Sequence, residues 1–498
     1  MPDGRATPVR AYGDTVTPHW MHAPDARQTG TLPDGPTTPR RTPPAPPRRR
    51  RWTAPPALLA VLLASLAVRL ALWARYIAAA DPATLLGGDS GEYHDSARAL
   101  LETGTFSVSP QLPLVPQTFR TPGYPSFLAA VYALAGERPA AALLVQLVLG
   151  VATIALVYLL VRERWGARVA LLAAVLLALD VGSLLLSLAV LTETLFTLLL
   201  VAALACGAAL LTRPDRRRWA LGMGVALAAC VLVRPVAYYL VAPVALGVAV
   251  HARRARWGVR ETAWTLALFL VPYGAVVGGW RLRNERVSGS AAFTRADAVV
   301  LLRYRAAAIV ARRDGIGLEE ARARLMAANA GHDDARWRRA GLELIRRNPG
   351  IYAGIVARGV LHTLLRPAGL RVGSAAAAPE PAWTEEARKA GPWDGARARL
   401  ARRGALYSAT FALDALLAVA TAGAAAYAVA RLAAGRQLTV VDAFLLGVVL
   451  YLLLVQAGAT SDARGRVPME PVLALYAARG LVDLRARLRP GARRPAVA

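Results

Sequence analysis

Residues 87–96 read GGDSGEYHDS, and residues 119–125 read FRTPGYP. The two stretches are rich in acids, glycine, proline and aromatic residues and share a single arginine, whereas most of the chain around them consists of long apolar runs. Both follow the first apolar run, 56–77, and lie within residues 80–138. We interpret 80–138 as an extracytoplasmic loop, and this polar pair of stretches as the part of the chain best suited to chemistry.

The composition predicts a membrane protein. The chain has 498 residues, of which 55% are hydrophobic. Its repeated runs of about 20 apolar residues match the thickness of a bilayer core, and only helices or closed barrels satisfy the backbone there. We therefore predict an all-α polytopic membrane protein with about ten transmembrane helices and additional helices in its extracytoplasmic loops.

The net charge of +28 has a membrane explanation. The basic residues cluster in the tails and between apolar runs, which is typical of cytoplasmic loops and of contact with anionic lipids. No nucleic-acid-binding module accompanies the charge, so we expect membrane lipids and no nucleic acid among the partners. Cys206 and Cys230 lie within apolar runs and indicate neither a disulfide nor a metal site.

The alternation of basic loops and apolar runs predicts the topology. Residues 1–52 are rich in proline and arginine and should form a disordered cytoplasmic tail. An N-terminal membrane module, 53–280, then leads to an extracytoplasmic segment, 281–405. C-terminal transmembrane helices over 406–486 precede a second basic cytoplasmic tail, 487–498. The expected spans are 56–77, 140–160, two within 169–211, two interrupted at 233–235, 263–280, 408–430, 441–455 and 472–484.

Several helices are expected outside the membrane core. Ser90 is predicted to cap the start of a short helix that stops at Gly104. A second loop helix is predicted over 124–134, and arginine-rich amphipathic helices over 318–328 and 334–347. Residues 351–365 are apolar but short, so we predict a partly embedded surface helix there rather than a span.

On this topology, charged residues from distant loops collect near the outer membrane boundary. Any one of them has a structural explanation, because helix ends commonly carry polar residues. Asp180, inside an apolar run, is harder to explain in this way, since intramembrane acids are costly. Carboxylates together with several arginines suit an anionic ligand. The set comprises Asp89, Asp95, Arg120, Glu193, Arg234, Arg281, Arg283, Arg464 and Arg466.

The order of these motifs resembles the GT-C glycosyltransferases. The matching features are Asp89 with Tyr93 four residues later, the FRTPGYP stretch, the turn at 191–193 and the RGRVP stretch at 464–468. The sequence is most similar to the bacterial branch related to protein O-mannosyltransferases and the lipid A aminoarabinose transferase. Many relatives have Asp-Glu at the catalytic position, whereas Ser90 follows Asp89 here. A role for a second acid would therefore pass to Glu92, Asp95 or Glu193.

The resemblance implies transfer of a sugar from a polyprenyl-phosphate donor to an acceptor hydroxyl, with inversion at the anomeric carbon. It implies an enzyme in the plasma membrane that works on the extracytoplasmic face, on a glycan, lipid or protein acceptor. Asp89 is the expected catalytic base, and Tyr93 and Tyr124 would contact the sugar ring or the lipid. The arginines would neutralise the leaving phosphate. The histidines lack metal-ligand spacing, and no metal or other cofactor is expected.

Two other classes of protein fit less well. A lipid or glycolipid transporter needs polar groups near the bilayer midplane on a path that reaches both faces, whereas apart from Asp180 the polar groups here favour one face. A non-catalytic scaffold leaves the collection of acids and arginines unexplained.

Overall fold

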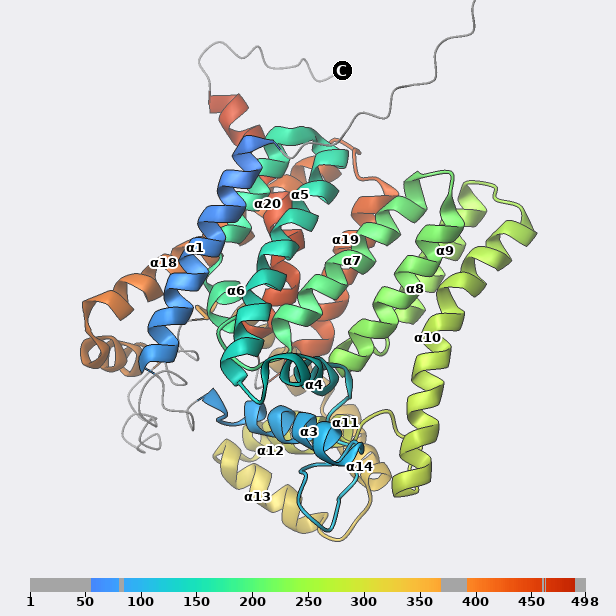
Figure 1. Ribbon diagram of the computed structural model, residues 1–498, viewed down its shortest axis with the longest axis vertical. Coiled ribbons are helices and arrows are strands. Elements are labelled where there is room, and N and C mark those ends of the chain that lie inside the picture. Colours follow the sequence, from blue (N-terminus) through green and yellow to red (C-terminus); the bar gives the residue numbers. More distant parts are fainter. Residues whose placement is uncertain (1–54, 80–84, 369–391, 459–460, 462, 489–498) are drawn as a thin grey trace, which may run out of the picture. The chain divides into compact units, whose positions relative to one another are not determined.

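The computed structural model describes residues 55–79, 85–368, 392–458, 461 and 463–488. Residues 1–52 and most of the C-terminal tail lie outside this part. The described residues belong to one compact unit, 54–498. Their regular secondary structure is helical, apart from one isolated bridge between Ser107 and Pro116. The prediction of an all-α protein is therefore confirmed (Figure 1).

Most of the apolar runs that were expected to span the membrane fall within one helix, but the run 169–211 is interrupted between 178 and 193, and the span after 233–235 begins with a short 3₁₀ helix. Six helices in the described part are long and apolar enough to cross a membrane, and the total of about ten stays a prediction. The remaining runs form shorter helices: α8 (Arg216–Val233), α19 (Val440–Gln456) and α20 (Glu470–Leu488). The six are α1 (Pro56–Ala79), α5 (Pro139–Ala178), α7 (Glu193–Thr212), η1 and α9 (Pro235–Ala237 and Val241–Arg254), α10 (Val259–Ser288) and, within α18 (Pro392–Ala434), Ser408–Ala434.

Two interruptions divide the long apolar region 139–212. Gly166 breaks α5 with φ +83°, a conformation that glycine adopts without steric cost. This kink coincides with the basic turn expected between the second and third spans. Further on, the side chain of Asp180 accepts a hydrogen bond from the Ser183 backbone N–H at 2.7 Å and so caps the short helix α6 (Val181–Leu186). Helix capping therefore explains this acid locally.

The polar loop forms two helices. α3 (Asp89–Thr103) begins after Gly88, which has φ +62°, and ends at Gly104 as predicted. The prediction that Ser90 caps this helix is wrong, because the positive φ of Gly88 starts the helix at Asp89 and Ser90 is buried in its first turn. The second loop helix is confirmed as α4 (Gly123–Ala135).

Tertiary contacts join the two loop helices to the bundle. α4 packs against α3 on one side and against α5 and α8 on the other. The rings of Tyr93 in α3 and Tyr124 in α4 meet edge to face with centroids 5.1 Å apart. Edge-to-face contact is a favoured geometry for aromatic pairs, and here it fixes the first turn of α3 against the membrane helices.

Residues 289–365 form a group of short helices after α10. The predicted amphipathic helices are confirmed as α13 (Leu318–Ala328) and α14 (Asp334–Arg347), and 351–365 lies in α15 (Pro349–Leu365). The embedding of α15 in a membrane stays a prediction. Figure 1 shows α11, α12, α13 and α14 at the same end of the bundle as α3 and α4. Three elements precede α13: α11 (Ala296–Val299), the π-helix η2 (Val300–Ala306) and α12 (Ala307–Asp314).

Candidate active site

Asp89 is the first residue of α3, and its carboxylate lies between two arginines from distant loops. Oδ1 accepts a hydrogen bond from Arg120 Nη2 at 2.6 Å, and Oδ2 accepts one from Arg464 Nη1 at 2.9 Å. The side chain is 37% exposed, so the carboxylate remains open on one side. The structure therefore brings together three residues that were selected from the sequence separately.

Glu193 extends this arrangement into the bundle. It is the first residue of α7 and is fully buried. Its Oε1 accepts a hydrogen bond from Arg234 Nη1 at 2.6 Å and another from Arg464 Nε. Arg464 thus bridges Glu193 and Asp89, and Arg234 neutralises Glu193 from the end of α8. A buried carboxylate needs such partners, because an unpaired buried charge is strongly unfavourable.

Arg120 is oriented by its neighbours on α3 as well as by Asp89. Its Nε donates to Glu92 Oε2 at 2.7 Å, and its Nη1 donates to the Tyr93 hydroxyl at 3.2 Å. The guanidinium also lies 4.9 Å from the centroid of the Tyr93 ring. The side-chain oxygen of the buried Gln117 accepts the backbone N–H of Arg120 at 3.1 Å. The arginine is therefore held by its side chain and its backbone together.

Tyr124 and Gln146 connect the aromatic part of the site to the turn before Glu193. The fully buried Tyr124 donates its hydroxyl hydrogen to Gln146 Oε1 at 2.6 Å. Gln146 Nε2 in turn donates to the backbone carbonyl of Ala189 at 2.8 Å. The sequence analysis did not select Gln146 or Gln117. Gln146 could have been found from the sequence, because it is the single amide in the apolar run 140–160.

The charges in this cluster hold one another in their ionised forms. Burial alone would raise the pKa of Asp89, but the charges and hydrogen bonds of Arg120 and Arg464 lower it below its usual value. Burial would lower the pKa of Arg464, whereas Glu193 and Asp89 raise it. Asp89 is therefore a carboxylate at neutral pH, and both of its oxygens are occupied by cations.

Two of the predicted arginines, at the end of α10, have their contacts outside the Asp89 cluster. Arg281 donates from Nε to the carbonyl of Ala291 at 2.8 Å. Arg283 donates to the carbonyls of Phe106 at 2.7 Å and Gln117 at 2.5 Å, and so ties the end of α10 to the polar loop. Arg283 therefore supports the loop that carries Arg120, whereas Arg281 contacts the segment after α10, and neither adds to the charged cluster.

Arg466 belongs to a second, buried group of charges. Its side chain is 2% exposed and pairs with Glu470 and, at 3.5 Å, with Asp414. It also donates to the backbone carbonyl of Arg366 at 3.0 Å. The structure thus separates Arg466 from Arg464, although only Gly465 stands between them. Asp95 is half-buried, and no contact in the described part of the chain joins it to Asp89.

The acids of the site face arginines rather than one another. Within the ranges that the structure describes, no group of three or more histidine, cysteine, aspartate or glutamate side chains has the arrangement of a metal site. The arrangement offers a partly open carboxylate with two guanidinium groups beside it. This combination suits proton acceptance next to an anion.

Comparison with known proteins gives one family match and several structural similarities. Residues 119–280 match the model of the family described as dolichyl-phosphate-mannose-protein mannosyltransferase. No curated protein matches the sequence.

The solved structures of similar shape include two kinds of enzyme. The oligosaccharyltransferase AglB from Archaeoglobus fulgidus, in complex with an inhibitory peptide and a dolichol-phosphate, is 15% identical with a TM-score of 0.48, and the alignment covers 88% of this chain and 52% of that one. The chain therefore spans about half the length of that enzyme. ArnT from Cupriavidus metallidurans bound to undecaprenyl phosphate is 16% identical with a TM-score of 0.40, and the alignment covers 86% of this chain and 79% of that one.

The segment 119–280 of the family match contains Arg120, Tyr124, Glu193 and Arg234, so it includes most of the charged cluster. Over residues 119–280, therefore, the chain matches the model of the family described as dolichyl-phosphate-mannose-protein mannosyltransferase, in agreement with the resemblance found in the sequence.

Proposed function

We propose that this protein transfers a sugar from a polyprenyl-phosphate donor to an acceptor hydroxyl at the outer face of the plasma membrane, with inversion at the anomeric carbon. The observation that carries this proposal is the position of the Asp89 carboxylate between Arg120 and Arg464. The family match over 119–280 supports the reaction class. The acceptor is a glycan, a lipid or a protein that presents the hydroxyl.

The donor's phosphate provides the anion for the arginines. In the ligand-free cluster, Arg120 and Arg464 are paired with acids of the chain itself. A polyprenyl phosphate that enters beside Asp89 competes for these guanidinium groups, which bind phosphate well. As the arginines turn to the phosphate, Asp89 loses the charges that depress its pKa and becomes a stronger base. Donor binding thus prepares the enzyme for proton transfer.

In the chemical step, the acceptor oxygen forms a bond to the anomeric carbon on the face opposite the phosphate. The bond between that carbon and the phosphate oxygen breaks, and polyprenyl phosphate leaves with the electron pair. Asp89 takes the proton of the acceptor hydroxyl. Arg120 and Arg464 stabilise the charge that develops on the leaving phosphate. Attack from the opposite face inverts the configuration.

Glu193 and Arg234 have a supporting role in this scheme. The fully buried Glu193 accepts a hydrogen bond from Nε of Arg464, and this contact leaves Nη1 of Arg464 directed at Asp89. Arg234 balances the charge of Glu193 when Arg464 turns toward the donor. Tyr93 packs against the guanidinium of Arg120 and against the ring of Tyr124, which is fully buried. The two rings therefore hold Arg120 in position, and a contact of the sugar ring or the lipid with them would need the buried rings to become accessible when the donor binds.

The arrangement favours an enzyme over a transporter. The paired charges of the Asp89 cluster lie at the ends of helices and in loops at one end of the bundle, and the side chain of Asp180 caps α6. A transporter would need comparable polar groups along a path through the bundle. The basic stretch 213–218 follows α7, and the basic stretch 251–260 begins in the last turn of α9 and continues after it. Both support a cytoplasmic position for the end of the bundle away from Asp89.

The test is a transfer assay with the purified full-length protein. A panel of polyprenyl-phosphate sugars is supplied with simple acceptor alcohols, and release of polyprenyl phosphate is followed. The proposal predicts sugar-dependent release by the wild type and none by Asp89→Asn. The same donors, carrying a label, are also tested for movement across the bilayer of vesicles that contain the protein. If no donor is turned over but a labelled donor crosses the bilayer, the protein is a transporter and this proposal is wrong.

A further inference from the structure

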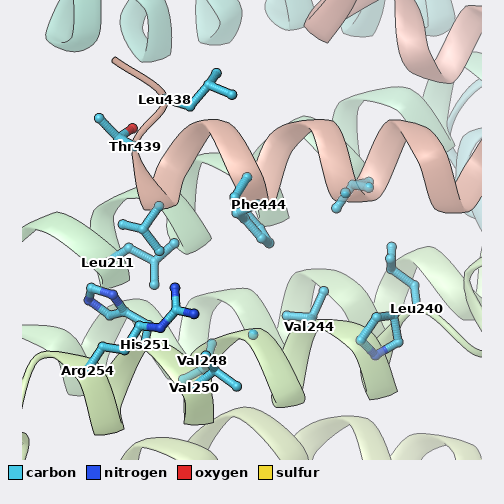
Figure 2. A pocket seen from close by; sticks show the side chains of 16 residues that line it. Leu211, Leu240, Val244, Val248, Val250, His251, Arg254, Leu438, Thr439 and Phe444 are labelled. Atoms are coloured by element: carbon cyan, nitrogen blue, oxygen red, sulfur yellow. The ribbon is translucent and has the colours of Figure 1, made fainter. Parts of the chain in front are cut away.

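A cavity of about 450 Å³ lies between α9 and α19, away from the charged cluster. Its walls are apolar and include Val244, Val248 and Phe444, as Figure 2 shows. Its volume falls in the range of about 300–1,000 Å³ that is typical of small-molecule sites. A cavity with such walls between two helices of a membrane bundle suits a hydrocarbon chain.

One end of this cavity is polar and basic. His251 and Arg254, in the last turn of α9, line that end together with Thr439 at the start of α19 (Figure 2). Within the part of the chain that the structure describes, Arg254 forms no ion pair with an acid. The acid nearest in sequence to Thr439 is Asp442, whose oxygens are taken by Arg164 at 2.8 Å, Tyr476 and Thr439 itself. Among the residues that the structure describes, no acid is thus ion-paired with Arg254 at the basic end.

The polar end is far from the proposed active site. Arg234, which pairs with Glu193, directly precedes η1 and α9, whereas Arg254 closes α9. At a rise of about 1.5 Å per residue, the 14 residues of α9 separate the two ends by about 20 Å. A ligand whose anion sits at Arg254 is therefore a second ligand and not the sugar donor in its reactive position.

We propose that this cavity binds an anionic phospholipid of the membrane leaflet on the side away from the active site. The phosphate of the headgroup binds at Arg254 and His251, and one acyl chain lies along α9 and α19 in the direction of Leu240. Basic pockets between transmembrane helices on the cytoplasmic side are a recurrent site for anionic headgroups. The lipid fills the space between the two helices and so stabilises their packing.

Glycines give the acyl chain its room. Gly247 and Gly447 line the cavity, and a Cβ placed on either would meet no atom within 4 Å. A leucine at Gly247 therefore has free space around its Cβ, and we expect the rest of its side chain to occupy part of the cavity. The same substitution raises helix propensity by about 1 kcal/mol, so loss of folding is not expected.

The experiment is a lipid titration of the delipidated full-length protein, followed by native mass spectrometry and by thermal stability in detergent. The probes are phosphatidylglycerol and, as a zwitterionic comparison, phosphatidylethanolamine. Arg254→Gln tests the headgroup contact, with Arg253→Gln as its control, because Arg253 is an equally exposed neighbour that does not line the cavity. Gly247→Leu tests the chain contact, with Gly274→Leu on α10 as its control, since Gly274 also has open space around it and lies outside the cavity.

The wild type should bind phosphatidylglycerol in preference to phosphatidylethanolamine and gain thermal stability from it. Arg254→Gln should weaken phosphatidylglycerol binding about fivefold, since one cationic contact with an anionic lipid contributes about 1 kcal/mol. Gly247→Leu should abolish the tightest binding event, and both control variants should behave as the wild type. Equal binding by Arg254→Gln and Arg253→Gln would overturn the headgroup assignment.

A competition experiment separates the phospholipid from the donor. Undecaprenyl phosphate added to the phosphatidylglycerol complex should leave the bound phospholipid in place. If it displaces the phospholipid from the wild type, and if undecaprenyl phosphate itself binds to the wild type but not to Gly247→Leu, the cavity belongs to the donor's chain and the proposal is wrong. Neither readout depends on sugar transfer, so the outcome is independent of the proposed enzymatic activity.

Discussion

Arg464 and Asp89 are joined by a hydrogen bond of 2.9 Å between Nη1 and Oδ2, although 375 residues separate them in the chain. The same guanidinium donates from Nε to Glu193. One arginine from the loop between α19 and α20 therefore links the first residue of α3 to the first residue of α7. Any change that moves these elements apart breaks the cluster, so its geometry depends on correct packing of the whole membrane region.

The first prediction concerns the base. Asp89→Asn should lower turnover by about 100- to 10,000-fold, because the amide keeps the size of the carboxylate and cannot accept the acceptor's proton. The measurement is polyprenyl phosphate release at saturating donor. Asp95→Asn is the control on the same helix and should retain most activity, since no contact in the described part of the chain links Asp95 to Asp89. Near-normal turnover by a well-folded Asp89→Asn would exclude Asp89 as the base.

The second prediction concerns the arginine that bridges the two acids. Arg464→Lys should lower kcat/KM for the donor by about 10- to 100-fold, because a lysine cannot reproduce two directed hydrogen bonds to two partners and hydrogen bonds to charged groups contribute about 1.5–3 kcal/mol each. The KM of the acceptor should change little. Steady-state kinetics with each substrate varied in turn provide the test. An equal loss for donor and acceptor would indicate a general distortion instead of a lost phosphate contact.

The residues of this cluster show how far sequence reasoning reaches. The helical fold and the gathering of Asp89, Arg120, Glu193 and Arg464 at one end of the bundle could be predicted from the alternation of apolar runs and basic loops, because the bilayer forces polar groups to helix ends. The individual ion pairs between them could not be predicted in this way. The separation of Arg464 from Arg466 was not predictable, since it depends on the 3₁₀ turns over 463–469 that direct the two side chains to different partners. Likewise, Gln146 became significant only when its partners Tyr124 and Ala189 were known.

The third prediction separates Arg466 from the active site. Arg466→Met should destabilise the protein by about 3–5 kcal/mol, because it leaves the buried carboxylates of Glu470 and Asp414 without their common cation. Donor KM in the folded fraction should stay as in the wild type. Thermal unfolding in detergent and donor kinetics on the same preparation measure the two effects. A raised donor KM at unchanged thermal stability would return Arg466 to the phosphate site.

The fourth prediction is a pH dependence. Arg120 and Arg464 lower the pKa of Asp89, so the acid limb of kcat/KM, which reports on the free enzyme, should lie below the usual aspartate value of about 3.9. The carboxylate also contributes stability above its unfolded-state pKa, and this contribution is lost as the pH falls through the lower folded-state pKa. Arg120→Gln removes one of the two charges, so it should move the acid limb to higher pH. If the acid limbs of kcat/KM of the wild type and Arg120→Gln coincide, a group other than Asp89 determines this limb.

The fifth prediction concerns sidedness. Ser288, at the exposed end of α10, should face the outside, and Arg256, in the basic stretch after α9, should face the cytoplasm. Single cysteines at these two positions, in a background with Cys206 and Cys230 replaced by alanine, are treated with an impermeant thiol reagent in intact cells. Ser288→Cys should react in intact cells, whereas Arg256→Cys should react only after the cells are permeabilised. A cysteine at Ala376 or Thr15 would extend the test to residues outside the described part.

The reverse labelling pattern would place the Asp89–Arg464 cluster on the cytoplasmic side, where the donor would have to come from a different pool of lipid-linked sugar. Labelling of both positions in intact cells would contradict the single span predicted between them.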